Sequence, residues 1–368
     1  MRYRIPSRFT MQEIIAPPLP ARAPLPAGRA QASTARLEWL WLLPFAAALY
    51  YPWALRWAHA GFVARDGSGV APLLSLLTAY LVPLAGFLAL YALGRQAALT
   101  DRLVLARRLA HLAVAAPPAY TLLGVLLYLM KINGHDIAVW TGLWIALAAL
   151  SAMTMRTTLP RPAVLDDPAV YSRLRVGHGI ASLALLLAFL APHLFNHMLG
   201  VLGNDVHMAA MDVLRAVYRH GAVEPVLITL FFLQILSGLV LLKPKTARRA
   251  DMLDSLQTAS GIYLALFIAS HINSVFVLAR YFGTDTNYAW AIGEPVGLVG
   301  DAWNIRLLPH YSIAVWLLIV HLACGLRVVM RGHGASESRS AAAALGVIGV
   351  GSLVTMVITA GMTGLRLA

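Results

Sequence analysis

Nine long apolar runs dominate this sequence, and they restrict the chain to a fold that can bury them in lipid. Each run has about 20 residues, the length at which an α-helix crosses the roughly 30 Å hydrocarbon core of a bilayer. We therefore predict an all-α, polytopic membrane protein with about nine transmembrane helices. The runs cover about 39–58, 70–94, 109–130, 137–155, 177–200, 222–242, 258–280, 309–330 and 341–363.

The composition excludes a water-soluble globule. Only 12% of the residues are charged, about half of the roughly 25% that a soluble domain carries. The single cysteine, Cys324, excludes an intramolecular disulfide and an iron–sulfur cluster held by this chain alone, because both need further thiolates. Any such cluster would belong to a partner protein.

Basic residues are distributed unevenly between the two sides of the predicted membrane protein. With the N-terminus in the cytoplasm, 21 of the 29 Lys and Arg residues fall on the cytoplasmic side, as the positive-inside rule requires. This placement explains the net charge of +13 without a nucleic-acid partner. We expect a protein of the bacterial inner (cytoplasmic) membrane, with its N-terminus cytoplasmic and its C-terminus outside.

The chain divides into three parts by composition. Residues 1–38 are rich in Pro, Ala and Arg and lack an apolar segment, which favours a cytoplasmic tail over a secretory signal. Residues 39–155 form a four-span block without an indicated role, and 171–363 form a five-span domain. The only long structured connection is expected at 281–308, where tryptophans favour a cap at the membrane interface.

Histidines inside the spans are the strongest sign of chemistry, since ionisable side chains are costly in lipid. His193 lies about 16 residues into its span and His271 about 13 residues into a parallel one, roughly 24 Å and 20 Å from the inner surface. Two imidazoles at one depth on different helices can ligate one haem iron. The sequence therefore predicts His193 and His271 as ligands of a haem b.

Two further polar residues lie at a second depth, closer to the cytoplasmic side than His193 and His271. His321 and Gln234 are each about 12 residues into spans that enter from the outer side, roughly 18 Å from the outer surface. A glutamine amide is a poor ligand for haem iron, so at least one haem is expected and the second site lacks a partner for His321. Neutral histidines bonded to a neighbouring helix are the alternative interpretation.

Several motifs in the last five spans resemble a known family, the cytochrome b membrane anchor of succinate dehydrogenase and fumarate reductase, in its five-helix, di-haem form. The resemblance covers about residues 171–363. The matching elements are Arg175-Val-Gly-His178 followed by His193, Ser260-Gly261 before His271, His321 before Gly325, and the loop Phe282-Gly-Thr-Asp-Thr-Asn-Tyr288.

The resemblance implies a distal haem on His193 and His271, and cofactor binding by His178 and His321. The family's remaining haem histidine maps onto Gln234, and the block 39–155 has no counterpart in the usual anchor. The resemblance also implies a membrane quinone as substrate, with flavoprotein and iron–sulfur subunits as partners. The expected quinone contacts are Asn196, His197, Tyr218, Arg219, Glu224 and His310.

The sequence thus favours a membrane cytochrome b-like protein that exchanges electrons with a quinone, as a subunit or relative of a quinone oxidoreductase. The alternative is a non-redox scaffold, a haem-handling protein or a transporter derived from the same fold. A hydrolase is not expected, because no nucleophile triad or H-E-x-x-H motif is recognisable.

Overall fold

The computed structural model describes residues 36–64, 69–163, 167 and 169–367, and its regular structure there is helical. Seven helical segments are long and apolar enough to cross a membrane, the architecture of a helical membrane protein. They are α3 (Val70–Gly94), α6 (Asp136–Thr157), α7 to η2 (Ser172–Leu202), α10 (Val223–Thr246), α11 with η3 (Met252–Tyr281), η4 with α14 (Asn304–Gly332) and α15 (Glu337–Met362).

Two further helices, bent against each other, are together long and apolar enough to form an eighth span. The apolar run expected at 109–130 begins earlier, as α4 (Asp101–Val114), and continues after a 59° bend as α5 (Ala116–Leu129). Pro117 and Pro118 follow the bend directly, and proline interrupts a helix because it lacks the N–H donor and clashes with the preceding turn. The expected start of this span, at about residue 109, is therefore wrong.

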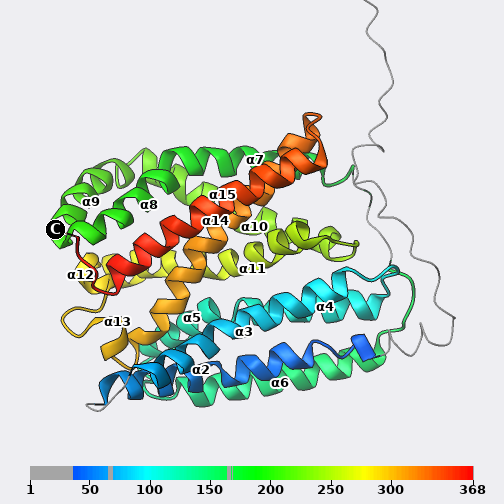
Figure 1. Ribbon diagram of the computed structural model, residues 1–368, viewed down its shortest axis with the longest axis horizontal. Helices are drawn as coiled ribbons and strands as arrows, with labels where there is room; N and C mark the ends of the chain where they lie inside the picture. The colour runs from blue at the N-terminus through cyan, green and yellow to red at the C-terminus, as the bar shows by residue number, and fades with distance from the viewer. Residues whose placement is uncertain (1–35, 65–68, 164–166, 168, 368) are drawn as a thin grey trace, which may run out of the picture.

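The remaining expected span, at about 39–58, corresponds to α2 (Leu42–Val63). This helix is as long as α6 but is not apolar enough to count among the candidate membrane spans. It packs against α3 and α6 in the structure (Figure 1). Arg56 and His59 lower its hydropathy. A total of nine spans stays a prediction.

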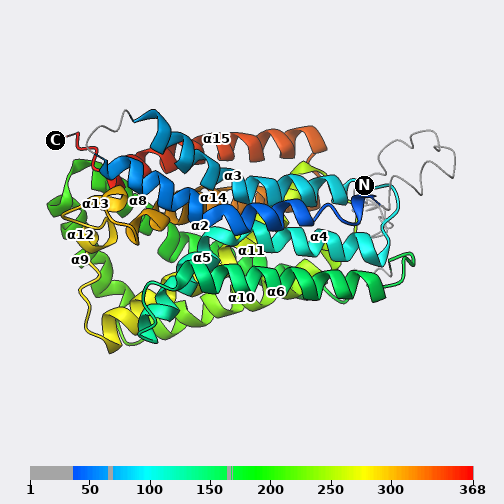
Figure 2. The same ribbon diagram turned by 90° about the horizontal axis from the view of Figure 1, so that it is seen from below.

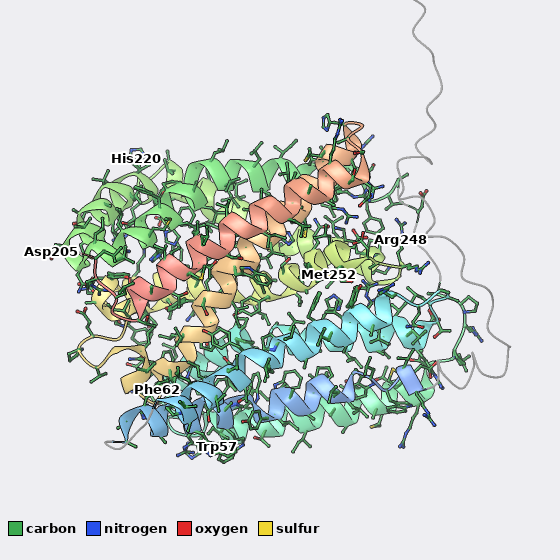
Figure 3. All side chains as sticks on the ribbon, viewed as in Figure 1. Trp57, Phe62, Asp205, His220, Arg248 and Met252 are labelled. Atoms are coloured by element: carbon green, nitrogen blue, oxygen red, sulfur yellow. The ribbon has the colours of Figure 1, made fainter. Side chains whose placement is uncertain are left out.

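The long helices run side by side in two groups, α2–α6 and α7–α15 (Figures 1 and 2). The first described residues and the C-terminus lie at opposite ends of the bundle (Figure 2). We call the end that holds the α3–α4, α10–α11 and α14–α15 connections the basic end; Arg248 lies there (Figure 3). The other end, the cap end, holds α9, α12 (Tyr288–Ala291) and α13 (Gly297–Gly300).

One element of the cap end was not expected. The connection between the spans at 177–200 and 222–242 contains α9 (Asn204–Tyr218), so 281–308 is not the only structured connection. Gly203 has a φ of 118°, a conformation that favours glycine, and it separates α9 from the preceding span. The helix lies across the cap end of the bundle, where Asp205 and His220 mark its two ends (Figure 3).

Arg107 on α4 joins the two groups of helices. Its buried guanidinium donates through Nη1 to the carbonyl oxygens of Thr246 at 3.0 Å, Arg248 at 2.7 Å and Lys245 at 3.4 Å. These carbonyls belong to the last residues of α10 and to Arg248 just after it, where a helix leaves its last acceptors without intrahelical donors. Arg107 thus supplies the donors that the end of α10 lacks.

We expect Arg107→Met to destabilise the folded protein by about 3 kcal/mol, because it removes charge-assisted hydrogen bonds to buried carbonyls. Thermal unfolding of the purified protein in detergent measures the effect. The matched control is Arg95→Met, which removes an exposed arginine bonded only to Tyr91 and should cost less than about 1 kcal/mol. Equal losses in the two variants would contradict the role given to Arg107.

Candidate functional site

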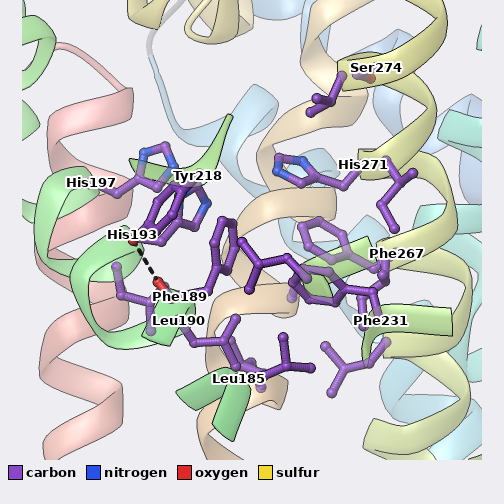
Figure 4. Close-up of a pocket in the computed structure, with 18 of the residues that line it drawn as sticks. Leu185, Phe189, Leu190, His193, His197, Tyr218, Phe231, Phe267, His271 and Ser274 are labelled. Atoms are coloured by element: carbon purple, nitrogen blue, oxygen red, sulfur yellow. Dashed lines mark hydrogen bonds between the residues drawn. The ribbon is translucent and has the colours of Figure 1, made fainter. Parts of the chain in front are cut away.

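A cavity of about 400 Å³ lies within the second group of helices, between α7–α8, α9, α10, α11 and α14. This volume is within the range of roughly 300–1,000 Å³ that is typical of cofactor and ligand pockets. The close-up in Figure 4 shows aromatic and aliphatic side chains on its walls, among them Leu185, Phe189, Phe231 and Phe267. The cavity is therefore suited to a large, mainly apolar molecule.

The first of two histidine pairs lies toward the cap end of this cavity. His193 on α8 (Ala191–Met198) and His271 on α11 (Met252–Asn273) have their ring centres 6.0 Å apart, and both point into the cavity (Figure 4). Phe189 stacks on His193 at 4.9 Å, and Phe267 stacks on His271 at 5.6 Å. The structure thus brings together the two residues of equal expected depth, and aromatic contacts hold both rings.

The second pair lies nearer the basic end. His178 on α7 (Ser172–Leu185) and His321 on α14 (Leu307–Gly332) have ring centres 6.3 Å apart. The residue opposite His321 is therefore His178, and not Gln234 as equal depth indicated. Gln234 instead fastens α10 to α7: its Nε2 donates to the His178 carbonyl at 2.9 Å, and its Oε1 accepts from Ser182 at 3.0 Å.

A π-helical segment explains how one helix presents both His178 and His193 to the cavity. The two residues are fifteen positions apart, which at 3.6 residues per turn is about 60° beyond four full turns. The π segment η1 (Leu186–Leu190) lies between them, and a π-helix has more residues per turn than an α-helix. The underwinding reduces the excess rotation and turns the two rings toward the same side.

Each ring of the second pair is held by a serine that precedes a glycine. His178 Nδ1 is 2.7 Å from Ser237 Oγ, and His321 Nδ1 is 3.0 Å from Ser260 Oγ. A Cβ at Gly238 or at Gly261 would lie 3.5 Å from Cε1 of the corresponding ring, so each glycine keeps its surroundings open. Because Nδ1 is engaged, Nε2 is the nitrogen that remains for a metal.

A polar cluster adjoins the first pair at the cap end, formed by Asn196, His197, His207 and Tyr288. His207 Nε2 lies 3.4 Å from both His197 Nδ1 and Asn196 Nδ2, and its ring stacks on Tyr288 at 4.0 Å. Burial, and then the charge of Arg215, lower the pKa of His207 to about 4. Asn196 Oδ1, His207 Nδ1 and Tyr288 Oη are buried without a hydrogen-bond partner among the described residues.

Buried polar atoms without partners are rare in proteins and indicate a bound molecule or water. All four residues of the polar cluster line the cavity. His207 and Tyr288 were missed in the sequence because they lie outside the apolar runs. The available signal was a helical stripe, since the α9 residues that line the cavity recur at helical spacing: His207, Met211, Leu214, Arg215 and Tyr218.

Most residues expected to contact a quinone line the cavity, namely Asn196, His197, Tyr218, Arg219 and Glu224. Tyr218 Oη donates to the Phe189 carbonyl at 3.4 Å (Figure 4). His310 does not line the cavity; it is buried against Phe267, with ring centres 4.7 Å apart. His310 is therefore separated from the cavity by an aromatic side chain.

Comparisons of the chain with protein-family models, with curated proteins and with solved structures give no match. Within the part of the chain that the structure describes, no group of three or more His, Cys, Asp or Glu side chains is arranged to hold a metal ion. The two-histidine pairs are the arrangement from which function has to be inferred.

The lowered pKa of His207 predicts acid sensitivity. In the unfolded chain this histidine titrates near 6.5, and in the folded protein near 4, so folding favours the neutral ring. The stabilisation is complete above pH 6.5 and is lost as the pH falls toward 4. We expect acidification from pH 7 to pH 5 to lower the Tm of His207→Gln less than that of the wild type; equal shifts would contradict this.

Proposed function

We propose that this protein is a membrane cytochrome that holds two b-type haems, one at each histidine pair, and exchanges electrons with a membrane quinone. The observation that carries the proposal is the ring separation of 6.0 Å and 6.3 Å. Two imidazoles on opposite sides of one metal, with metal–nitrogen bonds of about 2 Å, have ring centres about 6 Å apart. Both separations are compatible with a shared metal, and both pairs lie in one mainly apolar cavity.

The surroundings of the second pair also fit a planar macrocycle. Gly238 and Gly261 line the cavity, and a glycine on a helix face leaves room for a flat group. The walls are mainly apolar, which keeps water away from the pairs. A b-type haem, when bound, supplies one-electron transfer, at a potential that the protein sets through ligands, hydrogen bonds and burial.

Hydrogen bonds from neighbouring side chains position and orient the histidine rings of the second pair. Ser237 and Ser260 hold the rings of His178 and His321 through Nδ1, and such hydrogen bonds also raise the basicity of the ligating nitrogen. His178 and His193 are separated by roughly 22 Å along their helix at 1.5 Å per residue. The two pairs therefore lie at different depths, as carriers that pass electrons across a membrane require.

The polar cluster is the best position for a quinone headgroup. Its unpartnered atoms, Asn196 Oδ1, His207 Nδ1 and Tyr288 Oη, include groups that hydrogen-bond to a quinone carbonyl or hydroxyl oxygen. His193 and His197 have ring centres 4.6 Å apart, so the cluster directly adjoins the first pair. His197 and His207 can also exchange protons with a bound ring, as histidine commonly does.

This ligand set differs from the one that the family resemblance implies. One helix, α7–α8, supplies two histidines and α10 supplies none, so His178 takes the place that Gln234 leaves open. We also propose that the basic end is cytoplasmic and that flavoprotein or iron–sulfur subunits deliver electrons there. The excess of Lys and Arg in the tail and cytoplasmic loops supports this orientation.

We expect the purified protein to give a reduced-minus-oxidised spectrum of b type with two haems per chain. His193→Ala or His271→Ala should remove one haem, and His178→Ala or His321→Ala the other, because each change removes one axial ligand. The control is His220→Ala, an exposed histidine at the cap end, which should keep both. A wild-type protein without haem, after expression with adequate haem supply, would overturn the proposal in favour of a non-redox scaffold or transporter.

We expect Ser260→Ala to weaken retention of the basic-end haem by about 10- to 100-fold, the usual effect of removing a hydrogen bond to a metal-ligating histidine. Haem content after dialysis against a haem-binding competitor measures retention. Ser274→Ala is the matched control, since Ser274 lines the cavity and its hydroxyl donates to the Ser270 carbonyl instead of bonding a histidine ring. A loss shared equally by both variants would show general loosening of the cavity instead.

A further inference from the structure

The charged residues that line the cavity are all near its cap end. They comprise three arginines, Arg215, Arg219 and Arg280, and one carboxylate, Glu224. Arg280 is paired with Glu224 through both guanidinium Nη atoms. Among the described residues, Arg215 and Arg219 form no ion pair. The charged side chains that line the cavity therefore have a net charge of +2.

Arg215 and Arg219 are four positions apart near the end of α9, so they lie on one face of the helix, a turn apart. Arg215 Nη2 donates to the Thr286 carbonyl at 3.0 Å, which holds the guanidinium at the cavity. The charges of Asp212 and Asp285 also act on Arg215, but among the described residues neither carboxylate forms an ion pair with it. Two like charges this close favour an anion between or beside them.

A short series of ring contacts joins these arginines to the first histidine pair. Tyr218, next to Arg219, has its ring centre 4.7 Å from that of Phe189, and Phe189 stacks on His193 at 4.9 Å. Two rings, those of Tyr218 and Phe189, thus connect the helix end that carries the arginines to His193. A molecule held between His193 and His271 would meet them at its edge if that edge is directed toward α9.

We propose that Arg215 and Arg219 bind the two carboxylate side chains of the haem at the His193–His271 pair; this rests on the proposed function. The two arginines without an ion-pair partner among the described residues are equal in number and opposite in charge to the two carboxylates of a b-type haem. A guanidinium binds a carboxylate through two parallel hydrogen bonds, which fixes orientation as well as position. Arg219 is thereby assigned to the haem instead of to the quinone.

The test compares haem with haem dimethyl ester, in which both carboxylates are masked. The full-length chain carrying His178→Ala, which leaves only the cap-end site, is prepared without haem and titrated by absorbance. We expect the ester to bind about 10- to 100-fold more weakly than haem, as loss of charged hydrogen bonds implies. Adding Arg215→Gln and Arg219→Gln should remove this difference between haem and ester.

A redox titration of the wild-type holoprotein and its variants provides a second readout. Arg215→Gln with Arg219→Gln should lower the midpoint potential of the cap-end haem and leave that of the basic-end haem unchanged, because removal of positive charge disfavours the reduced iron. The control is Arg339→Gln, an exposed arginine of α15 outside the cavity, which should change neither potential.

The outcomes separate this inference from the function on which it rests. Equal affinity for haem and ester in the chain with intact arginines would overturn the carboxylate site while leaving the cytochrome in place. Loss of anionic phospholipid from the double arginine variant, with haem affinity unchanged, would assign the arginines to a lipid headgroup and also overturn the inference. Failure of the wild type to bind any haem would remove the proposed function itself.

Discussion

Two pairs of imidazole rings inside one mainly apolar cavity, with ring centres 6.0 Å and 6.3 Å apart, are the constraint on which the arrangement of this bundle depends. Polar side chains are costly inside a membrane-spanning bundle unless they have a partner or a task. Four such rings, in two pairs with nearly the same separation, have to be held by three different segments, α7–α8, α11 and α14. If each pair shares one metal, as we propose, a shift of one helix by about 1 Å would place a ring out of reach of that metal.

The first group of helices provides a rigid support for two of these segments. Tyr80 bonds to Ser312 on α14 at 2.8 Å, and Asp136 pairs with Arg306 just before α14. Helix α11 packs against α3, α4 and α5 as well as against α14. The block without a counterpart in the resembled family thus braces the helices that carry His271 and His321, while most of α7 stays exposed to lipid or to a partner.

The sequence predicted heights along the bundle better than directions around each helix. Run length and rise per residue were sufficient to place seven of the nine expected spans. They also related His193 to His271, because depth depends only on counting. Counting residues could not show which way each side chain points around its helix. It therefore placed Gln234 opposite His321, whereas the structure has His178 in that position. The π segment that turns His178 and His193 to one side, and the serines that hold the second pair, follow from packing between distant parts of the chain.

His207 and Tyr288, the two residues of the polar cluster that the sequence analysis missed, were missed for a different reason. Hydropathy selects residues in apolar runs, whereas His207 lies on α9 and Tyr288 on a short helix of the cap. Both become buried only when the cap folds over the cavity. The spacing of the cavity-facing residues along α9 was the one local sign, and it is shared by any amphipathic surface helix. The bend between α4 and α5, by contrast, had a visible cause in two consecutive prolines.

The identity of the iron ligands tests the central claim most directly. Low-temperature electron paramagnetic resonance and near-infrared magnetic circular dichroism of the oxidised full-length protein report the spin state and axial ligands of each haem. The account predicts two low-spin ferric centres, each with two imidazole ligands. High-spin iron, or an axial ligand other than histidine at either centre, would contradict it.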